Sequence, residues 1–255
     1  MTTALDTEQL TTKVKRMYRD VAERPGGPYH FETGRPLAER LGYDRKLLDR
    51  IPAAALDSFA GVGQFFDLAS LAEGERVFDL GSGSGTDAFI AGTLVGATGL
   101  VVGVDFTPEQ LAKARALASA AGVDGHVQFR YGRIEDLPAP DGAVDCVISN
   151  GVINLCPNKA AVFTEVARVL RPGGRLAIAD IVTERALAPA IVCNVDLWAS
   201  CIGGAAQESV YRQAIEDAGL HVEAVRANPY EFLSNGARDA TTTYGVKSIS
   251  LLAVK

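Results

Sequence analysis

The sequence has no long hydrophobic run, few cysteines and no excess of positive charge. No stretch of its 255 residues approaches the roughly 18 uninterrupted apolar residues of a membrane-spanning helix. Its polar, acidic start contains no apolar core typical of a signal peptide. The 25 basic and 31 acidic residues give a net charge of −6, which argues against partners such as nucleic acid or an anionic membrane surface. We therefore expect a cytoplasmic protein that binds a small molecule.

The cysteines and histidines are too few and too scattered for a disulfide framework or a metal centre. Cys146, Cys156, Cys193 and Cys201 contain no CxxC pair. In a cytosolic protein we expect these thiols to stay reduced. None of the three histidines has a partner at the spacing of metal ligands, so no metal site is predicted.

The organisation of the chain changes near residue 74. In residues 1–74, apolar side chains recur at helical spacing within 6–24, and a proline- and glycine-rich stretch follows. This region is predicted to be a helical lid or cap without a core of its own. Residues 75–255 alternate short apolar runs with helical patterns, which indicates a parallel sheet covered on both faces.

Seven strands and several helices can be placed from residue 75 onward. Helices are predicted from Thr107 to Gly122, with Gln110 as the capping-box partner of Thr107, and also over 158–170 and 208–218. The predicted strands are Arg76–Leu80, Val101–Val104, Val127–Tyr131, Val144–Ser149, Arg175–Asp180, His221–Val225 and Lys247–Ala253. In such sheets ligands bind beyond the carboxyl ends of the strands, so the motifs must be interpreted at those ends.

The first strand ends in an acid followed by a glycine-rich turn. Asp79 precedes Gly81, Gly83 and Gly85, and Thr86 stands where a dinucleotide-binding fingerprint has its last glycine. An acid at this place would repel a diphosphate but suits a ligand that carries an ammonium and a sulfonium. The turn therefore disfavours a nicotinamide-dependent oxidoreductase.

Two further turns suggest an adenosine ligand. Asp105 ends the second strand, at a position where an acid accepts hydrogen bonds from ribose hydroxyls, and Phe106 could pack on the purine. After the third strand, the amide of Ile134 and the side chain of Glu135 could contact an adenine edge. Singly, Asp105 could be an acid that precedes a helix, and Glu135 a solvated loop charge. Together the three turns favour adenosine.

These motifs resemble those of class I S-adenosylmethionine-dependent methyltransferases, from about Glu75 to the C-terminus. The resemblance rests on the runs VFDLGSGSGTD, VVGVDFTPEQL, GRIEDLP, VDCVISNGVIN and VARVLRPGGRLAIADIV. The nearest family is the arsenite methyltransferases, whose pattern resembles ISNGVINLCPNK and DLWASCIGGA of this chain. The resemblance implies an α/β fold with a seven-stranded, mostly parallel, Rossmann-like sheet whose final strand is antiparallel. It also implies a substrate-side insertion at about 183–207.

The same resemblance implies the cofactor and the residues that contact it. S-adenosylmethionine is the expected cofactor, and Asn150 is expected beside its methyl group, with Asn150 and Cys201 as the catalytic residues. The expected cofactor-binding residues are Tyr18, Asp79, Gly81, Ser82, Gly83, Gly85, Asp105, Phe106, Ile134, Glu135 and Asn150.

The acceptor side departs from the family pattern. Family members hold trivalent arsenic with cysteines, of which Cys201 matches one, but Gly151 replaces the cysteine that directly follows Ser-Asn. No cysteine precedes Cys146, so Cys156 is the candidate replacement thiol. Trp198, three residues before Cys201 and expected on the same helical face, could line the acceptor pocket or pack in the core. The predicted substrate residues are Gly151, Cys156, Trp198 and Cys201.

Three functions remain open. The leading one is methyl transfer to a small-molecule acceptor, with arsenite, another trivalent arsenical or a thiol as the leading acceptors. Gly151 opens room beside the methyl group, which favours the alternative of C-, O- or N-methylation of a small metabolite. A non-catalytic cofactor- or metalloid-binding protein is the third hypothesis, although three intact adenosine turns argue against it. A monomer or a homodimer is expected.

Overall fold

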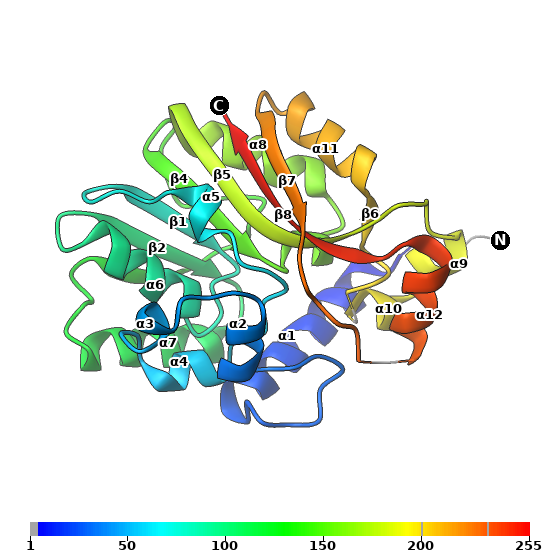
Figure 1. Ribbon diagram of the computed structural model, residues 1–255, viewed down its shortest axis with the longest axis horizontal. Helices are drawn as coiled ribbons and strands as arrows, with labels where there is room; N and C mark the ends of the chain where they lie inside the picture. Colours follow the sequence, from blue (N-terminus) through cyan, green and yellow to red (C-terminus); the bar gives the residue numbers. More distant parts are fainter. Residues whose placement is uncertain (1–4, 200, 234) are drawn as a thin grey trace.

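Short runs rich in valine and isoleucine form the strands of one twisted sheet, because β-branched side chains pack well on a pleated surface buried on both faces (Figure 1). The computed structural model describes residues 5–199, 201–233 and 235–255. The strands are β1 (Arg76–Leu80), β2 (Leu100–Asp105), β3 (Val127–Tyr131), β4 (Val144–Asn150), β5 (Leu170–Thr183), β6 (Ala206–Gln207), β7 (His221–Ala227) and β8 (Lys247–Val254).

Helices precede the sheet and connect its strands. The N-terminal ones are α1 (Thr7–Glu23), α2 (Arg35–Arg40), α3 (Arg45–Leu48), α4 (Ala53–Asp57) and α5 (Phe66–Ala69). The others are α6 (Thr86–Val95), α7 (Pro108–Ala120), the 3-10 turn η1 (Ile153–Leu155), α8 (Lys159–Val169), α9 (Pro189–Val192), α10 (Val195–Ala199), α11 (Glu208–Asp217) and α12 (Asn235–Tyr244). No helix of the described residues is long and apolar enough to cross a membrane.

The sheet confirms the predicted Rossmann-like architecture. The seven main strands have the order β3-β2-β1-β4-β5-β8-β7, and β8 is antiparallel to both β5 and β7. Two details differ from the sequence prediction. The two-residue β6 adds a short parallel pairing to β5. β5 begins at Leu170, because Leu170 pairs with Val144 and the Gly173 amide donates to the carbonyl of Lys255, which extends the backbone there.

The predicted capping box at the start of α7 is wrong. Thr107 does precede the helix, but its side chain makes no cap hydrogen bond. Gln110 instead bonds Ser84 of the glycine-rich turn and the backbone carbonyl of Tyr18 in α1. A buried hydroxyl and a buried carbonyl require partners more strongly than an exposed helix end does.

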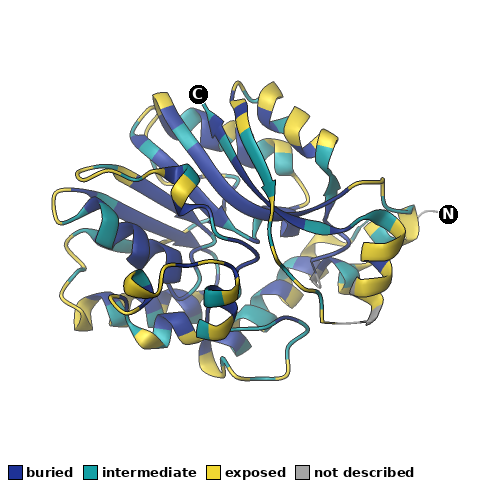
Figure 2. Ribbon diagram, viewed as in Figure 1, coloured by how far each residue is buried: buried dark blue, intermediate teal, exposed yellow. Residues whose placement is uncertain are grey.

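Two hydrophobic clusters lie on the two faces of the sheet. Along β4, Cys146 and Ile148 belong to one cluster and Val147 to the other, as the alternation of a strand requires. Val144 joins the cluster of Val147 because the register shifts between Val144 and Cys146. Cys146 is fully buried, as expected of a small core residue. Figure 2 shows that the strands are buried and that exposed residues concentrate on the outer sides of the helices.

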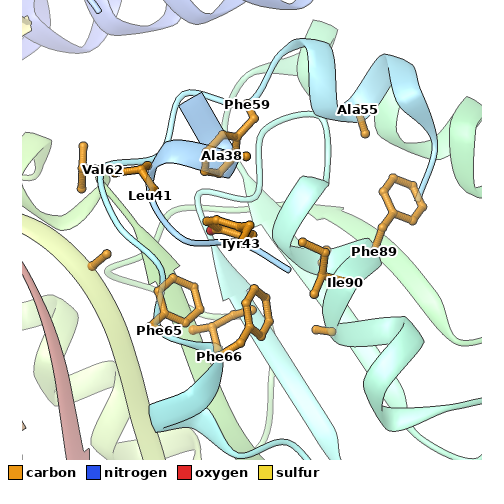
Figure 3. Close-up of a cluster of buried hydrophobic side chains, with 14 of the residues drawn as sticks. Ala38, Leu41, Tyr43, Ala55, Phe59, Val62, Phe65, Phe66, Phe89 and Ile90 are labelled. Atoms are coloured by element: carbon orange, nitrogen blue, oxygen red, sulfur yellow. The ribbon is translucent and has the colours of Figure 1, made fainter. Parts of the chain in front are cut away.

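The N-terminal region packs into the same core as the sheet. Phe65 is fully buried, and the aromatic and aliphatic side chains around Tyr43 lie against Ile90 of α6 (Figure 3). The segment is also attached by polar contacts, since Ser248 and Ser250 of β8 donate to the carbonyls of Val62 and Gln64 at 2.6 and 2.7 Å. The region therefore has no separate core among the described residues.

The segment between β5 and β6 differs from its prediction. α9 and α10 are two separate short helices, with Cys193 at the end of the first, so Cys193 and Cys201 share no helix. Cys201 follows α10 in a left-handed turn with φ of 62°, so it does not share a helical face with Trp198. Asn194 separates the two helices, and its side-chain oxygen accepts from the amides of Asp196 and Leu197 at the start of α10. In space α10 lies beside α1 (Figure 1).

Phe65→Ala tests whether the N-terminal region and the sheet unfold as one unit. Removal of this fully buried ring is expected to lower the free energy of unfolding by about 3–5 kcal/mol within a single transition, measured by urea denaturation followed by circular dichroism. Val210→Ala, at a position 59% exposed, is the control and should change it by less than about 0.5 kcal/mol. Two separate transitions would contradict a shared core.

Candidate active site

The glycine-rich turn after β1 forms one wall of a cavity beyond the carboxyl ends of the strands. Gly81 and Gly85 have φ of +68° and +96°, which are backbone conformations that residues other than glycine rarely adopt. A Cβ on Gly85 would also lie 2.6 Å from the ring of Phe129, and one on Gly81 would collide with Val152. The turn thus needs glycine for both conformation and space, and it brings Ser82 and Gly83 to the cavity surface.

Asp79 lies at the inner end of this cavity. Its carboxylate is buried, and its Oδ2 atom has no hydrogen-bond partner in the described structure. Burial raises the pKa of Asp79 well above its usual value, and the nearby carboxylates of Asp87 and Asp105 raise it further. A buried carboxylate oxygen without a donor is suited to a cation from a ligand.

Asp105 connects the second strand to the glycine-rich turn. Its two carboxylate oxygens accept hydrogen bonds from the amides of Thr107 and Gly83, at 2.7 and 3.0 Å. Burial raises the pKa of Asp105, and these amide bonds oppose the rise. Each carboxylate oxygen retains a lone pair for a ligand hydroxyl. Phe106 also lines the cavity, and the ammonium of Lys15 lies 5.2 Å from its ring centre.

The third turn lies beside the same cavity. Ile134 is buried and Glu135 is half-buried, and both line the cavity. Burial opposes ionisation of Glu135, but the hydrogen bond from Arg133, at 2.7 Å, and one from Cys156 outweigh it and lower the pKa of Glu135.

The motifs alone did not reveal a buried hydrogen-bond network around Asp87, which lines the same cavity as Asp79. Tyr43 donates to Asp87 Oδ1 at 2.7 Å, and the Asn150 side-chain amide donates to Asp87 Oδ2 at 3.0 Å. The Asn150 side-chain oxygen accepts from the amide of Val62 at 2.8 Å. Burial raises the pKa of Asp87 to about 6, against the two donors. Asn150 therefore also holds the N-terminal region against β4.

A second connection joins α1 to the glycine-rich turn. Ser84 donates to Gln110 Oε1 at 2.5 Å, and Gln110 Nε2 donates to the Tyr18 carbonyl at 2.8 Å. The Tyr18 ring lines the cavity and stacks with Phe31 at a centroid distance of 6.1 Å. Burial raises the pKa of Tyr18 well above its usual value, and Cys201 contributes to the rise. Tyr18 thus brings α1 of the N-terminal region to the cavity.

The cavity carries an excess of negative charge. Among the described residues that line it there is one cationic side chain, Arg133, and four carboxylates, those of Asp79, Asp87, Asp105 and Glu135. Arg133 is already paired with Glu135. Such a cavity favours a ligand that brings its own positive charge.

Gly151, which the sequence predicts as a substrate residue, is not among the described residues that line the cavity. Gly151 directly follows β4, with φ of +70°. A Cβ at this position would lie 3.2 Å from Cγ1 of Val62, which is buried. The space that a side chain at 151 would occupy is therefore next to an aliphatic group.

Cys156 and Cys201 lie in different surroundings. Cys156 lines the cavity near Glu135 and belongs to one hydrophobic cluster, whereas Cys201 belongs to the cluster on the other face of the sheet. Burial raises the pKa of both thiols to about 12, with Glu135 contributing at Cys156 and Asp180 at Cys201. Trp198 packs beside Cys201 and under Lys159, whose ammonium is 5.0 Å from its ring centre. Neither Trp198 nor Cys201 is among the described residues that line the cavity.

The comparisons with known proteins agree with this geometry. Residues 71–219 match the family model of the methyltransferase domain. The chain is a class I S-adenosylmethionine-dependent methyltransferase. S-adenosylmethionine is the methyl donor of this family, and the partnerless Asp79 oxygen and the acid-lined cavity suit the ammonium and sulfonium of that cofactor.

Two relatives and one solved structure indicate where in this methyltransferase family the chain lies. It is 40% identical over 84% of its length to an arsenite methyltransferase of Halobacterium salinarum, and covers 55% of that protein. It is 38% identical over 51% of its length to the human arsenite methyltransferase, of which it covers 36%. The chain thus spans about half the length, or less, of these curated relatives. An arsenic(III) S-adenosylmethionine methyltransferase from Chlamydomonas reinhardtii superposes with a TM-score of 0.64 at 30% identity, over 87% of this chain and 73% of the other.

A further solved structure shares the fold alone. Geranyl diphosphate C-methyltransferase from Streptomyces coelicolor, solved with S-adenosyl-L-homocysteine, has a TM-score of 0.68 at 18% identity, over 96% of this chain and 97% of that one. The shared fold therefore includes both the N-terminal and the C-terminal parts of this chain.

Asp105→Ala is expected to abolish binding of S-adenosylhomocysteine in calorimetry. Charge-assisted hydrogen bonds contribute about 1.5–3 kcal/mol each, so the loss of two weakens binding by more than about 100-fold. Asp105→Asn, which keeps one acceptor for the backbone amides, controls for disruption of the turn and should also bind weakly. Asp124→Ala, on an exposed loop, is the matched control. Unchanged affinity in both Asp105 variants would contradict the assignment.

Proposed function

We propose that this methyltransferase acts on a small metabolite through a carbon, oxygen or nitrogen nucleophile, without a pair of thiolates to hold the acceptor. The observation that carries the proposal is the position after Asn150. There Gly151 faces the aliphatic side chain of Val62, where the arsenite methyltransferase pattern has a cysteine.

The state of the remaining thiols supports this proposal. A thiolate, not a thiol, is the ligand of a soft metalloid. Burial keeps the pKa of Cys201 and Cys156 at about 12, so both are thiols at neutral pH. Cys156 lines the cavity and Cys201 does not, which supports separate roles rather than a shared site.

The proposed roles on the donor side follow the three turns. Asp79 receives the ammonium, with Gly81, Ser82, Gly83 and Gly85 of the glycine-rich turn around the methionyl part. Asp105 binds the ribose hydroxyls, Phe106 packs on adenine, and Ile134 and Glu135 contact its edge. When bound, the cofactor supplies an electrophilic methyl group on a sulfonium.

The remaining chain supplies position and exclusion of water. We propose that residues 1–74 act as a lid, in which Tyr18 closes the cavity. Asn150 fixes the end of β4 and the Val62 segment through its two side-chain groups, so the acceptor side is rigid. In-line displacement depends mainly on such positioning. Residues about 183–207 form the substrate-side insertion in this proposal, with Trp198 and Cys201 near the acceptor.

A trivalent arsenical is the second candidate acceptor. It is favoured by Cys201, which matches the family pattern, and by the arsenite methyltransferases among the relatives. Formation of an arsenic–sulfur bond would require the Cys201 thiol to give up its proton, which leaves with an arsenic-bound hydroxide as water. Burial otherwise keeps this thiol neutral. A non-catalytic role is the least supported, because the donor cavity contains all three turns.

The experiment is product analysis by mass spectrometry. Purified protein is incubated with labelled S-adenosylmethionine and a reducing thiol, with arsenite in one arm and a panel of small C-, O- and N-nucleophiles in the other. Our proposal expects no methylated arsenic and label transfer to a panel member. Methylated arsenic that disappears in Cys201→Ser would overturn the proposal and establish the second candidate.

Cys146→Ala serves as the thiol control in these assays. Because Cys146 is fully buried within β4, its replacement should leave the rate of any methyl transfer unchanged. The loss of a buried sulfur is expected to lower the free energy of unfolding by about 1 kcal/mol, measured by urea denaturation. A folded but inactive Cys146→Ala protein would contradict a purely structural role for this cysteine.

A further inference from the structure

Two carboxylates share the inner end of the donor cavity without a basic residue to neutralise them. Asp79 ends β1 and Asp87 lies in the first turn of α6, and both are buried and line the cavity. Besides burial, the charge of Asp87 raises the pKa of Asp79, and the charge of Asp105 in β2 raises it further. Among the described residues that line the cavity, Arg133 is the one basic side chain, and it is paired with Glu135. Two buried carboxylates this close cannot both ionise readily.

The hydrogen-bond donors around the pair are distributed unequally. Asp87 accepts from the Tyr43 hydroxyl of the N-terminal region and from the Asn150 amide of β4, one donor for each oxygen. The backbone amide of Ala88 opposes the rise in the pKa of Asp79, but Asp79 Oδ2 has no donor within the described structure. Donors stabilise the ionised form, so Asp87 is the carboxylate and Asp79 is the member that holds a proton.

We propose that the free enzyme holds one proton on Asp79, and that the ammonium group of the cofactor's methionyl part displaces this proton when the cofactor binds. The O–H bond of the Asp79 carboxyl breaks, the proton passes to solvent through the cavity, and the ammonium takes its place beside the carboxylate. Release of the product reverses the exchange. Asp87 acts here as a positioning residue, because its charge sets how strongly Asp79 retains its proton.

The direction of the pH dependence follows from this exchange. At a pH where Asp79 is protonated in the free enzyme, binding releases a proton, and affinity rises with pH. Above that range Asp79 is already ionised, so proton release falls to zero. Burial raises the pKa of Asp87 to about 6 and the pKa of Asp79 well above its usual value. Binding is therefore measured at pH 6.5. At this pH a free α-amino group, with a pKa of about 8, remains protonated.

The proposal concerns the donor side alone and is independent of the acceptor. It rests on cofactor binding, which is measured here without turnover, so a failure to methylate any acceptor leaves it unaffected. The probe is S-adenosylhomocysteine, which carries the ammonium. 5′-Methylthioadenosine, which keeps the adenosine and the sulfur but lacks the amino-acid part, is the matched ligand control.

The experiment is titration calorimetry of the full chain at pH 6.5 in buffers of different ionisation enthalpy. The dependence of the observed enthalpy on the buffer gives the number of protons exchanged. We expect release of about one proton with S-adenosylhomocysteine and none with 5′-methylthioadenosine. Absence of proton release with S-adenosylhomocysteine, in a protein that binds it, overturns the proposal.

Variants distinguish a positioning role of Asp87 from a merely structural one. Asp87→Asn removes the neighbouring charge, so Asp79 ionises more easily and proton release should fall below half of the wild-type value. Affinity for 5′-methylthioadenosine should change less than about threefold if the cavity is intact. Asp79→Asn should release no proton and bind S-adenosylhomocysteine at least about tenfold more weakly. Asp124→Asn, on an exposed loop, should behave as the wild type.

A second variant keeps the proposal testable if Asp87→Asn does not fold. Tyr43→Phe removes a donor from Asp87, so the pair retains its proton to higher pH. The pH at which proton release reaches half its maximum should therefore move upward. A midpoint that stays in place or moves downward in a folded Tyr43→Phe protein overturns the assigned coupling.

Discussion

The buried carboxylate of Asp87 is the constraint on which the arrangement of the molecule depends. A charge in this position needs donors, and it finds them in Tyr43 of the N-terminal region and Asn150 at the end of β4. The same Asn150 side chain accepts from the amide of Val62. Removal of any member leaves a buried polar group without a partner, at a cost of about 1–3 kcal/mol. The network therefore ties the N-terminal region, α6 and the end of β4 into one structure.

The negative charge of the donor cavity opposes stability in the free protein and favours the cationic cofactor. Asp79, Asp87 and Asp105 converge because the carboxyl ends of parallel strands and the helix that follows β1 meet at one edge of the sheet. Burial of each carboxylate raises its pKa, so these groups bind protons more strongly in the native than in the unfolded chain. Their contribution to stability is then lost as pH rises, and a bound cation compensates for it.

The surroundings of Gly151 and Cys201 are built from elements that are distant in sequence. Val62 of the N-terminal region lies against Gly151 after β4, and Cys201 follows α10 in a left-handed turn. α10 in turn lies beside α1, which carries Tyr18. The contact between Val62 and Gly151 thus joins the N-terminal region to the end of β4.

The sequence by itself determined the seven main strands and the glycine-rich turn, because hydrophobic period and glycine conformation are local properties. It also picked out Asp105 and Glu135, which both line the cavity. It also supported the antiparallel β8 through family resemblance. Only the tertiary structure decided the partners of buried polar groups. It recruited Gln110 to Ser84 and Tyr18 instead of a helix cap, and it joined Tyr43 to Asp87, 44 residues away. Such pairings depend on burial and on long-range contacts, which no local pattern encodes.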